Sequence, residues 1–332
     1  MKSPRWFGWL LAVTVLVAAC ALSLLVGTKS IPAGEIWLAL TGPGSTPDHV
    51  TVTEYRVPRT LLGLLVGLAL GVAGCLMQGL TRNPLADPGL LGVNAGAAFA
   101  ITVAVGILGV SEITSYVWFG FAGAALVSVI VYRLGTAGRT GTDPVRLTLA
   151  GVAATAVLSG LTRGLMLLDP KAFDEMRRWD SGSLTGRGYE IIAGAAPFIL
   201  VGLVIAAASA RSLNAVALGD DLARALGVHV NRTRLFTALA LVLLCGTATA
   251  AVGPVAFVGL AVPHIARWLV GPDQRWIFAY SLILAPILVL AADVLGRVII
   301  RPDEVPAGLI TAFLGAPVLI WLARRAKVGA AA

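Results

Sequence analysis

Long apolar stretches, each of about twenty residues, recur along this chain and decide what it can fold into. A helix needs about 20 mostly apolar residues to cross the hydrocarbon core of a membrane. Because lipid offers no hydrogen bonds, a spanning segment must satisfy its own backbone groups, and a helix does so. The sequence therefore predicts an all-α fold, a polytopic membrane protein with about ten transmembrane helices. The predicted spans lie near residues 6–28, 60–80, 89–110, 115–135, 147–168, 190–210, 234–252, 255–270, 276–296 and 306–323.

Composition agrees with a membrane protein. Hydrophobic residues make up 58% of the chain and charged residues only 13%, whereas soluble domains carry about 25% charged residues. The net charge of +8 does not come from a basic cluster with interleaved aromatic residues, so no nucleic-acid partner is expected. We expect residues 1–332 to form a single transmembrane domain.

The distribution of basic residues predicts the orientation. Lys and Arg are held on the cytoplasmic side of a membrane, and most of the 25 fall in loops that are cytoplasmic if the N-terminus lies inside. Both termini and the polar loop at residues 211–233 are then cytoplasmic. The basic N-terminus followed by an apolar run is also the layout of a signal peptide, and Val17-Ala18-Ala19-Cys20 resembles a lipoprotein cleavage box. Because the apolar run continues beyond Cys20, we expect an uncleaved first span.

Motifs for catalysis, metal binding or nucleotide binding are not found in the sequence. The three histidines are isolated, and no stretch matches the phosphate-binding pattern GxxxxGK[ST]. We therefore expect no metal site, no cofactor and no ATPase activity of the chain's own. Asp293 is the nearest candidate for an intramembrane ion relay, but a helix-end pair with Arg297, four residues later, explains it better. His264, beside Pro263, is expected to be a hydrogen-bonded group at a helix end rather than a ligand.

The second span begins with a pair of arginines and contains a glycine repeat. Arg56 and Arg59 are three residues apart and share one face of its first turn. They could anchor the span at the headgroup level or form a docking point for an acidic surface outside the cell. Further along, Gly63, Gly67 and Gly71 recur at four-residue spacing, which predicts the close approach of a neighbouring helix.

Three long strings carry a family resemblance. RVPRTLLGLLVGLALGVAGCLMQGLTRNPLADPGLLGVNAGAA at 56–98, FVGLAVPHIARWLVGPDQR at 257–275 and PAGLITAFLGAP at 306–317 resemble the FecCD-type permeases. These are membrane subunits of ATP-binding-cassette (ABC) importers for ferric siderophores, haem and cobalamin. The resemblance covers residues 54 to 325, and Trp179–Leu184 is similar to the family's outer W-x-x-G-S-L segment. Its middle, Asp180-Ser181, departs from the family pattern, so no substrate contact is assigned there.

The resemblance implies a function and a set of partners. The chain would be the permease subunit of an importer that moves an iron-siderophore-type chelate across the bacterial cytoplasmic membrane. Its partners would be a pair of ATP-binding subunits, an external substrate-binding protein and a second permease subunit, either a copy or a paralogue. Cobalamin or haem are alternative substrates. An ion-gradient-driven secondary transporter is the alternative from another class, and it would need an essential intramembrane acid.

The resemblance also implies roles for individual residues. Arg56, Arg59 and Arg297 match arginines that dock the binding protein. The translocation path and its gate would include Asn83, Leu85, Thr148 and Leu149. The pattern G-x-x-x-A-x-x-L-G marks the segment that couples to the ATPase: Gly219, Asp220, Asp221, Leu222, Ala223, Arg224, Ala225, Leu226 and Gly227. Within it we expect one short helix, with the two aspartates at its N-terminus and an apolar face formed by Leu222, Ala225 and Leu226.

Overall fold

Helices account for all the regular structure in the residues that the computed structural model describes, which are 5–110, 112–136 and 144–329. The helices are α1 (Arg5–Leu25), α2 (Ala33–Thr41), α3 (Pro47–Val50), α4 (Val57–Thr81), α5 (Val93–Gly106), α6 (Ile113–Thr136), α7 (Pro144–Leu168), α8 (Pro170–Asp180), α9 (Tyr189–Ala217), α10 (Asp220–Ala225), α11 (Val230–Leu241), α12 (Thr247–Val252), α13 (Val258–Val270), α14 (Gln274–Ile299) and α15 (Ala307–Gly329). A π-helical turn, Thr51–Arg56, joins α3 to α4, and a second, Val242–Gly246, joins α11 to α12. The predicted all-helical class is confirmed for this part of the chain.

Seven helical segments in the described part of the chain are long and apolar enough to cross a membrane. They are Trp6–Leu25, Pro47–Thr81, Ile113–Gly135, Val145–Leu168, Tyr189–Ala217, Val230–Val252 and Gln274–Ile299. Three shorter apolar helices are Val93–Gly106, Val258–Val270 and Ala307–Ile320. Each predicted span falls on one of these segments. A count of ten spans therefore requires the three short helices to cross as well.

Some helices differ in extent from the spans predicted for them. The helical segment that contains the predicted span 60–80 begins at Pro47, because α3, the π-helical turn and α4 follow one another without a break. The helix within the predicted span 255–270 begins at Val258, since Phe257 before it has a φ of 67° that interrupts the helix. The amphipathic helix α8 was not predicted. Its start carries a recognisable signal, because Asp169 caps it by accepting a hydrogen bond from the backbone N–H of Lys171 (2.9 Å) and Pro170 occupies the first helical position.

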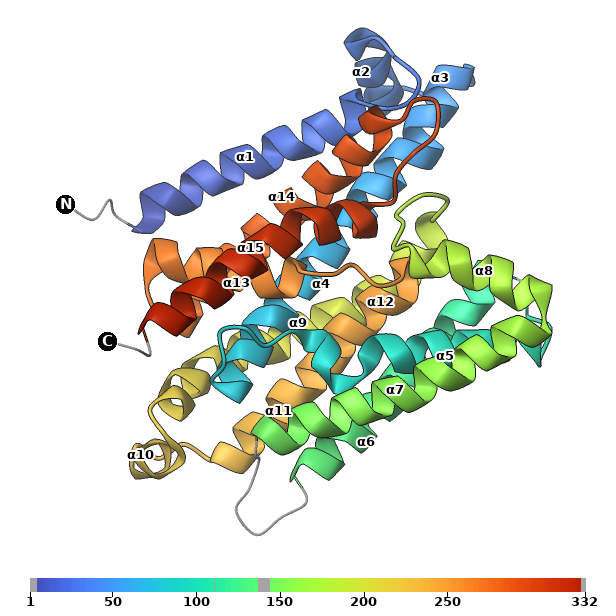
Figure 1. Ribbon diagram of the computed structural model, residues 1–332. Helices are drawn as coiled ribbons and strands as arrows, with labels where there is room; N and C mark the ends of the chain where they lie inside the picture. The colour runs from blue at the N-terminus through green and yellow to red at the C-terminus, as the bar shows by residue number, and fades with distance from the viewer. Residues whose placement is uncertain (1–4, 111, 137–143, 330–332) are drawn as a thin grey trace.

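The helices run roughly along one common direction, so the molecule has two distinct ends (Figure 1). The start of α1, the end of α15 and the short helix α10 lie at one end. Helices α2, α3 and α8 lie at the opposite end. The segments predicted to be cytoplasmic are thus gathered at the same end as α10.

Helix α4 forms the centre of the bundle and packs against α14, α9 and α13. A Cβ atom added to Gly67 would lie 2.4 Å from the Cα atom of Pro286 in α14, and one added to Gly71 would lie 2.9 Å from the carbonyl oxygen of Ser281. These distances leave no room for a side chain, so the two backbones touch. The predicted packing role of the glycine stripe is confirmed.

Candidate functional site

The guanidinium of Arg56, at the end of the bundle opposite α10, is buried and bound to backbone oxygens. It donates to the carbonyls of Leu24 (2.6 Å), Leu25 (3.0 Å) and Lys29 (2.5 Å). An arginine offers five N–H donors in a fixed fork, so one side chain can satisfy several carbonyls left free at a helix end. Arg56 therefore fixes the end of α1 against the start of α4.

Asp293 of α14 lies between two arginines. Arg59 donates to it through Nε and Nη2 (2.8–3.1 Å), and Arg297 donates through Nε (3.1 Å) and Nη2. Arg297 also binds the carbonyls of Ser23 (2.7 Å) and Val26 (2.9 Å) in and after α1. The pair that Asp293 was predicted to form with Arg297 is confirmed. With 1% of its surface exposed and two cationic partners, Asp293 is a buried structural counter-ion.

The three arginines predicted to dock the binding protein are thus engaged within the subunit. Arg59 is the most accessible of them: its Nη1 donates to Glu304 (2.6 Å), a residue whose side chain is 25% exposed. Glu304 also accepts a hydrogen bond from the hydroxyl of Thr185 (3.1 Å). Docking through these arginines stays a prediction. The internal contacts show that each already has a structural task.

The segment predicted to couple to the ATPase forms the short helix α10. Gly219 and Gly227 bracket it with φ values of 114° and 80°, which a side chain would make unfavourable. Ala223 packs inward against Val216 and Val230. Leu222 and Leu226 are 49% and 60% exposed at the end of the molecule. The expected single helix is present, and its apolar side chains are open to a partner.

Asp220, the first residue of α10, makes two ion pairs that the sequence did not predict. It accepts from Nη2 of Arg82, the residue that follows α4 with a φ of 52°, and from Arg234 of α11 (3.0 Å). Arg82 immediately precedes Asn83. The carboxylate of Asp220 therefore joins α10 both to α11 and to the loop that carries two of the predicted gate residues.

The four predicted gate residues lie in two segments. The side-chain oxygen of Asn83 accepts from the backbone N–H of Leu85 (3.0 Å), which makes a tight turn after α4. Thr148 and Leu149 lie in the second turn of α7, and Leu149 is exposed. The 3₁₀ helix Pro88–Leu91 links the two segments, because a Cβ atom added to Gly151 of α7 would lie 1.7 Å from the carbonyl oxygen of Leu90. Thus α7 is seated directly on the turn that follows α4.

The Trp179–Leu184 segment connects three helices at the end opposite α10. Trp179 is buried, the backbone N–H of Ser183 donates to Val252 at the end of α12 (2.9 Å), and that of Gly308 in α15 donates to Gly182 (2.8 Å). The neighbouring Asp180 and Ser181 instead line a cavity of about 440 Å³ beside α7. The residues that match the family pattern thus make the contacts that connect the helices. Asp180 and Ser181, which depart from the pattern, line the cavity instead.

The prediction that His264 is a hydrogen-bonded group at a helix end is wrong. Helix α13 continues through Pro263, so the histidine lies inside a helix rather than at its end. Its ring packs edge-on against Trp268, one turn later, with 4.7 Å between ring centroids. Its Nδ1 atom is buried and has no hydrogen-bond partner among the described residues. An aromatic neighbour, not a hydrogen bond, is thus the contact that the structure gives this ring.

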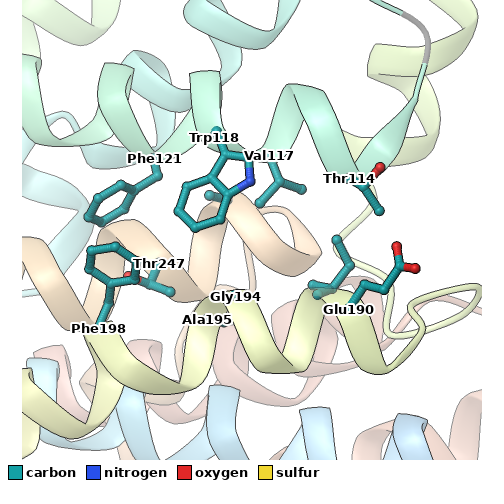
Figure 2. Close-up of a pocket in the computed structure, with 11 residues that line it drawn as sticks. Thr114, Val117, Trp118, Phe121, Glu190, Gly194, Ala195, Phe198 and Thr247 are labelled. Carbon is teal, nitrogen blue, oxygen red and sulfur yellow. The ribbon is translucent and has the colours of Figure 1, made fainter.

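An apolar pocket of about 150 Å³ lies between α6, α9 and α12 (Figure 2). Trp118 and Phe121 of α6 face Phe198 of α9, with ring centroids 5.9 and 4.8 Å apart. Pockets for small-molecule ligands usually measure about 300–1,000 Å³. This pocket is therefore smaller than a typical ligand site.

Comparisons with known proteins agree with this architecture. Residues 15–325 match the model of the FecCD transport family. The ferric enterobactin transport system permease protein FepD of Escherichia coli K12 is 50% identical, over 96% of this chain and 95% of the relative. The probable siderophore transport system permease protein YfiZ of Bacillus subtilis 168 is 38% identical, over 97% of each chain. A solved structure described as an inward-facing metal-chelate type ABC transporter superposes with a TM-score of 0.82 at 25% identity, covering 96% of this chain and 98% of its own. The chain belongs to the FecCD transport family, and it is a transport permease subunit rather than an enzyme.

Proposed function

We propose that this chain is the permease subunit of an ABC importer that moves an iron-siderophore-type chelate across the bacterial cytoplasmic membrane. Family membership and the two siderophore-transport relatives support this function. The observation that carries the mechanism is Asp220, which joins the exposed helix α10 to the turn at Asn83. A separate pair of ATP-binding subunits would drive transport by pressing on α10, and this chain would hydrolyse nothing itself.

The proposed topology has ten spans, with the three short apolar helices α5, α13 and α15 crossing as well. A short helix need not match the full bilayer thickness where neighbouring protein rather than lipid surrounds it, and α5 and α13 are buried along much of their length. Both termini and α10 would face the cytoplasm, in line with the positive-inside rule. Residues 1–332 would form one permease domain, with the coupling loop at 211–233.

A second permease subunit would complete the transporter. Helix α7 supports this part of the proposal, because only 17% of its most apolar window is buried, against 78% for the segment that contains α4. Leu149, Val152 and Val157 are exposed along α7. We propose that Asn83, Leu85, Thr148 and Leu149 line the path and its gate where two subunits meet. The partner would be a second copy or a paralogue.

Transport assays separate this function from the ion-driven alternative. With both permease subunits, the ATP-binding subunits and the binding protein reconstituted in vesicles, uptake of the ferric chelate should require ATP. It should continue when an ionophore collapses the ion gradients, because Asp293 is held between two arginines and is not free to relay ions. Uptake that stops with the ionophore while ATP stays high would contradict the proposal. Uptake of cobalamin or haem instead of the ferric chelate would leave the proposed ABC importer function intact and change only the proposed substrate.

Docking of the binding protein is proposed at Arg56, Arg59 and Arg297, with Arg59 making the direct contact. Glu304 occupies one side of the Arg59 guanidinium in the free subunit and is partly exposed, so a carboxylate of the binding protein could replace it there. We expect Arg59→Gln to weaken binding-protein affinity about tenfold, since a charge-assisted hydrogen bond is lost. Glu304→Gln should leave affinity unchanged or raise it, because the competing internal carboxylate is removed.

The measurement is the Kd of the purified binding protein for the assembled transporter, at low and at high salt. The thermal stability of each variant controls for the structural contacts of Arg59. If folded Arg59→Gln binds as tightly as the wild type, docking takes place elsewhere. Substitution of Arg56 or Arg297 is a poor test, because their bonds to the carbonyls around the end of α1 would be lost as well.

A further inference from the structure

A cavity of about 440 Å³ opens between α7 and α8, and three charged side chains line it. Arg163 comes from α7, and Arg177 and Asp180 come from α8. Helix α8 lies at the end of the molecule opposite α10 (Figure 1). In the proposed topology, the cavity is therefore on the outer half of the transporter.

The two arginines are exposed, and among the described residues neither has a hydrogen-bond or ion-pair partner. The adjacent Arg178 differs, since it pairs with Glu175 one turn earlier and does not line the cavity. Burial raises the pKa of Asp180, and the nearby positive charge of Arg163 offsets part of that rise. The lining carries two guanidiniums and one carboxylate, so the cavity keeps a net positive charge when Asp180 is ionised.

The position of Arg163 indicates that the cavity contains water rather than lipid. It lies five residues before the end of α7, a helix apolar enough to span a membrane. Arginines in such helices avoid hydrocarbon and face a water-filled space or a polar partner. The hydroxyl of Thr162, also at the cavity, is buried with 7% of the residue exposed and lacks a hydrogen-bond partner among the described residues. Polar groups left in this state are expected to be satisfied by water or by a ligand.

The remaining walls suit a large, soft and partly aromatic ligand. Phe173 and Met176 of α8 and Met166 of α7 line the cavity beside the arginines. Methionine sulfur makes favourable contacts with aromatic rings, and the arginine plane stacks on them as well as pairing with oxygen anions. Catecholate groups combine both features, because each is an aromatic ring with two anionic oxygens when it holds ferric iron.

We propose that this cavity is a subsite for an anionic ferric chelate of the catecholate type, with Arg163 and Arg177 as the residues that select for negative charge. The inference rests on the proposed import function and narrows its substrate class. Catechols lose two protons each when they bind ferric iron, so a tris-catecholate complex is an anion. Hydroxamates lose one proton each, so the corresponding ferric complex is neutral. Only the anion gains from two unpaired guanidiniums.

Charge-removing variants test the proposal in the assembled transporter with its binding protein. Arg163→Gln and Arg177→Gln should each raise the half-saturating concentration for uptake of a ferric tris-catecholate about tenfold, and the double variant should raise it further. Arg178→Gln is the matched control, because it removes an equal charge from the next residue of the same helix without touching the cavity. It should behave as the wild type. The conservative variants Arg163→Lys and Arg177→Lys should recover most of the uptake.

Three outcomes would count against the subsite. The Gln double variant could match Arg178→Gln, the Lys variants could fail as badly as the Gln variants, or wild-type transporter could import a neutral ferric tris-hydroxamate and not the anion. Binding-protein affinity and ATPase activity, measured in parallel, should stay unchanged in every variant, so that a loss is assigned to the chelate. Failure of the proposed function is distinct, since the wild type would then import no iron chelate at all.

Discussion

Replacing Arg224 and Ala225 with glutamate should release the ATP-binding subunits from the purified membrane complex. Both residues are exposed on α10, next to Leu222 and Leu226, whose side chains are open at the end of the molecule. A carboxylate buried in an apolar interface without a partner costs several kcal/mol, and alanine leaves room for close approach where glutamate does not. We expect the amount of co-purified ATP-binding subunit to fall more than tenfold, which corresponds to about 1.4 kcal/mol or more of lost binding free energy.

Insertion of the variant should be normal, because α10 lies outside the predicted spans and Ala223, the residue that packs inward, is unchanged. A matched control is Arg275→Glu at the start of α14, which reverses a charge at an exposed residue outside α10. This variant should retain the ATP-binding subunits. Co-purification at wild-type levels from the α10 variant would show that the ATPase binds another surface and would remove α10 from its proposed role.

Asp220→Asn should have a different effect: the ATP-binding subunits stay bound and hydrolyse ATP, but chelate uptake falls about tenfold or more. The variant keeps the size of the side chain and removes the charge that holds Arg82 and Arg234. Arg234 is buried, so an uncompensated charge there is costly, and hydrogen bonds to charged groups contribute about 1.5–3 kcal/mol each. The link between α10 and the turn at Asn83 should therefore loosen while the outer face of α10 is untouched.

The control is Asp221→Asn, which removes the same charge from the neighbouring residue. The side chain of Asp221 is fully exposed, and Arg224 on the surface of α10 is its one ion-pair partner among the described residues, so transport per ATP should not change. A double-mutant cycle with Arg82→Gln measures the link itself: if Asp220 acts through Arg82, the double variant should be no worse than either single variant. Additive losses, or equal losses in Asp221→Asn, would rule out this connection.

Local patterns in the sequence were sufficient for much of the fold. The apolar runs located the helices, and the Gly63–Gly67–Gly71 spacing predicted a close helix contact because residues four apart share one face. The same rule identified the pair of Asp293 with Arg297. Spacing along the sequence could not identify the second partner of Asp293, Arg59, which lies 234 residues away. Spacing shows which side chains share a helix face but not which helix comes to lie opposite.

For the functional residues too, local patterns were predictable and contacts between distant segments were not. The bracketing glycines Gly219 and Gly227 and the apolar positions between them predict one short helix, and α10 is present there. Its aspartates were interpreted only as favourable charges near a helix N-terminus. Asp220 in fact pairs with Arg82, 138 residues earlier, a contact that depends on how α4 ends. His264 was assigned to a helix end because prolines usually mark one, whereas the surrounding helices hold α13 together through Pro263.

The contact of α4 with α14 has a consequence for how such a transporter moves. Where Gly67 meets Pro286, the two backbones are in direct contact. No side chain lies between them that could change rotamer and so accommodate a movement. Sliding or rotation of one helix on the other would drive backbone atoms into one another. The ion pair of Arg59 in α4 with Asp293 in α14 also joins these two helices near one end. We expect α4 and α14 to move as one rigid body during the transport cycle.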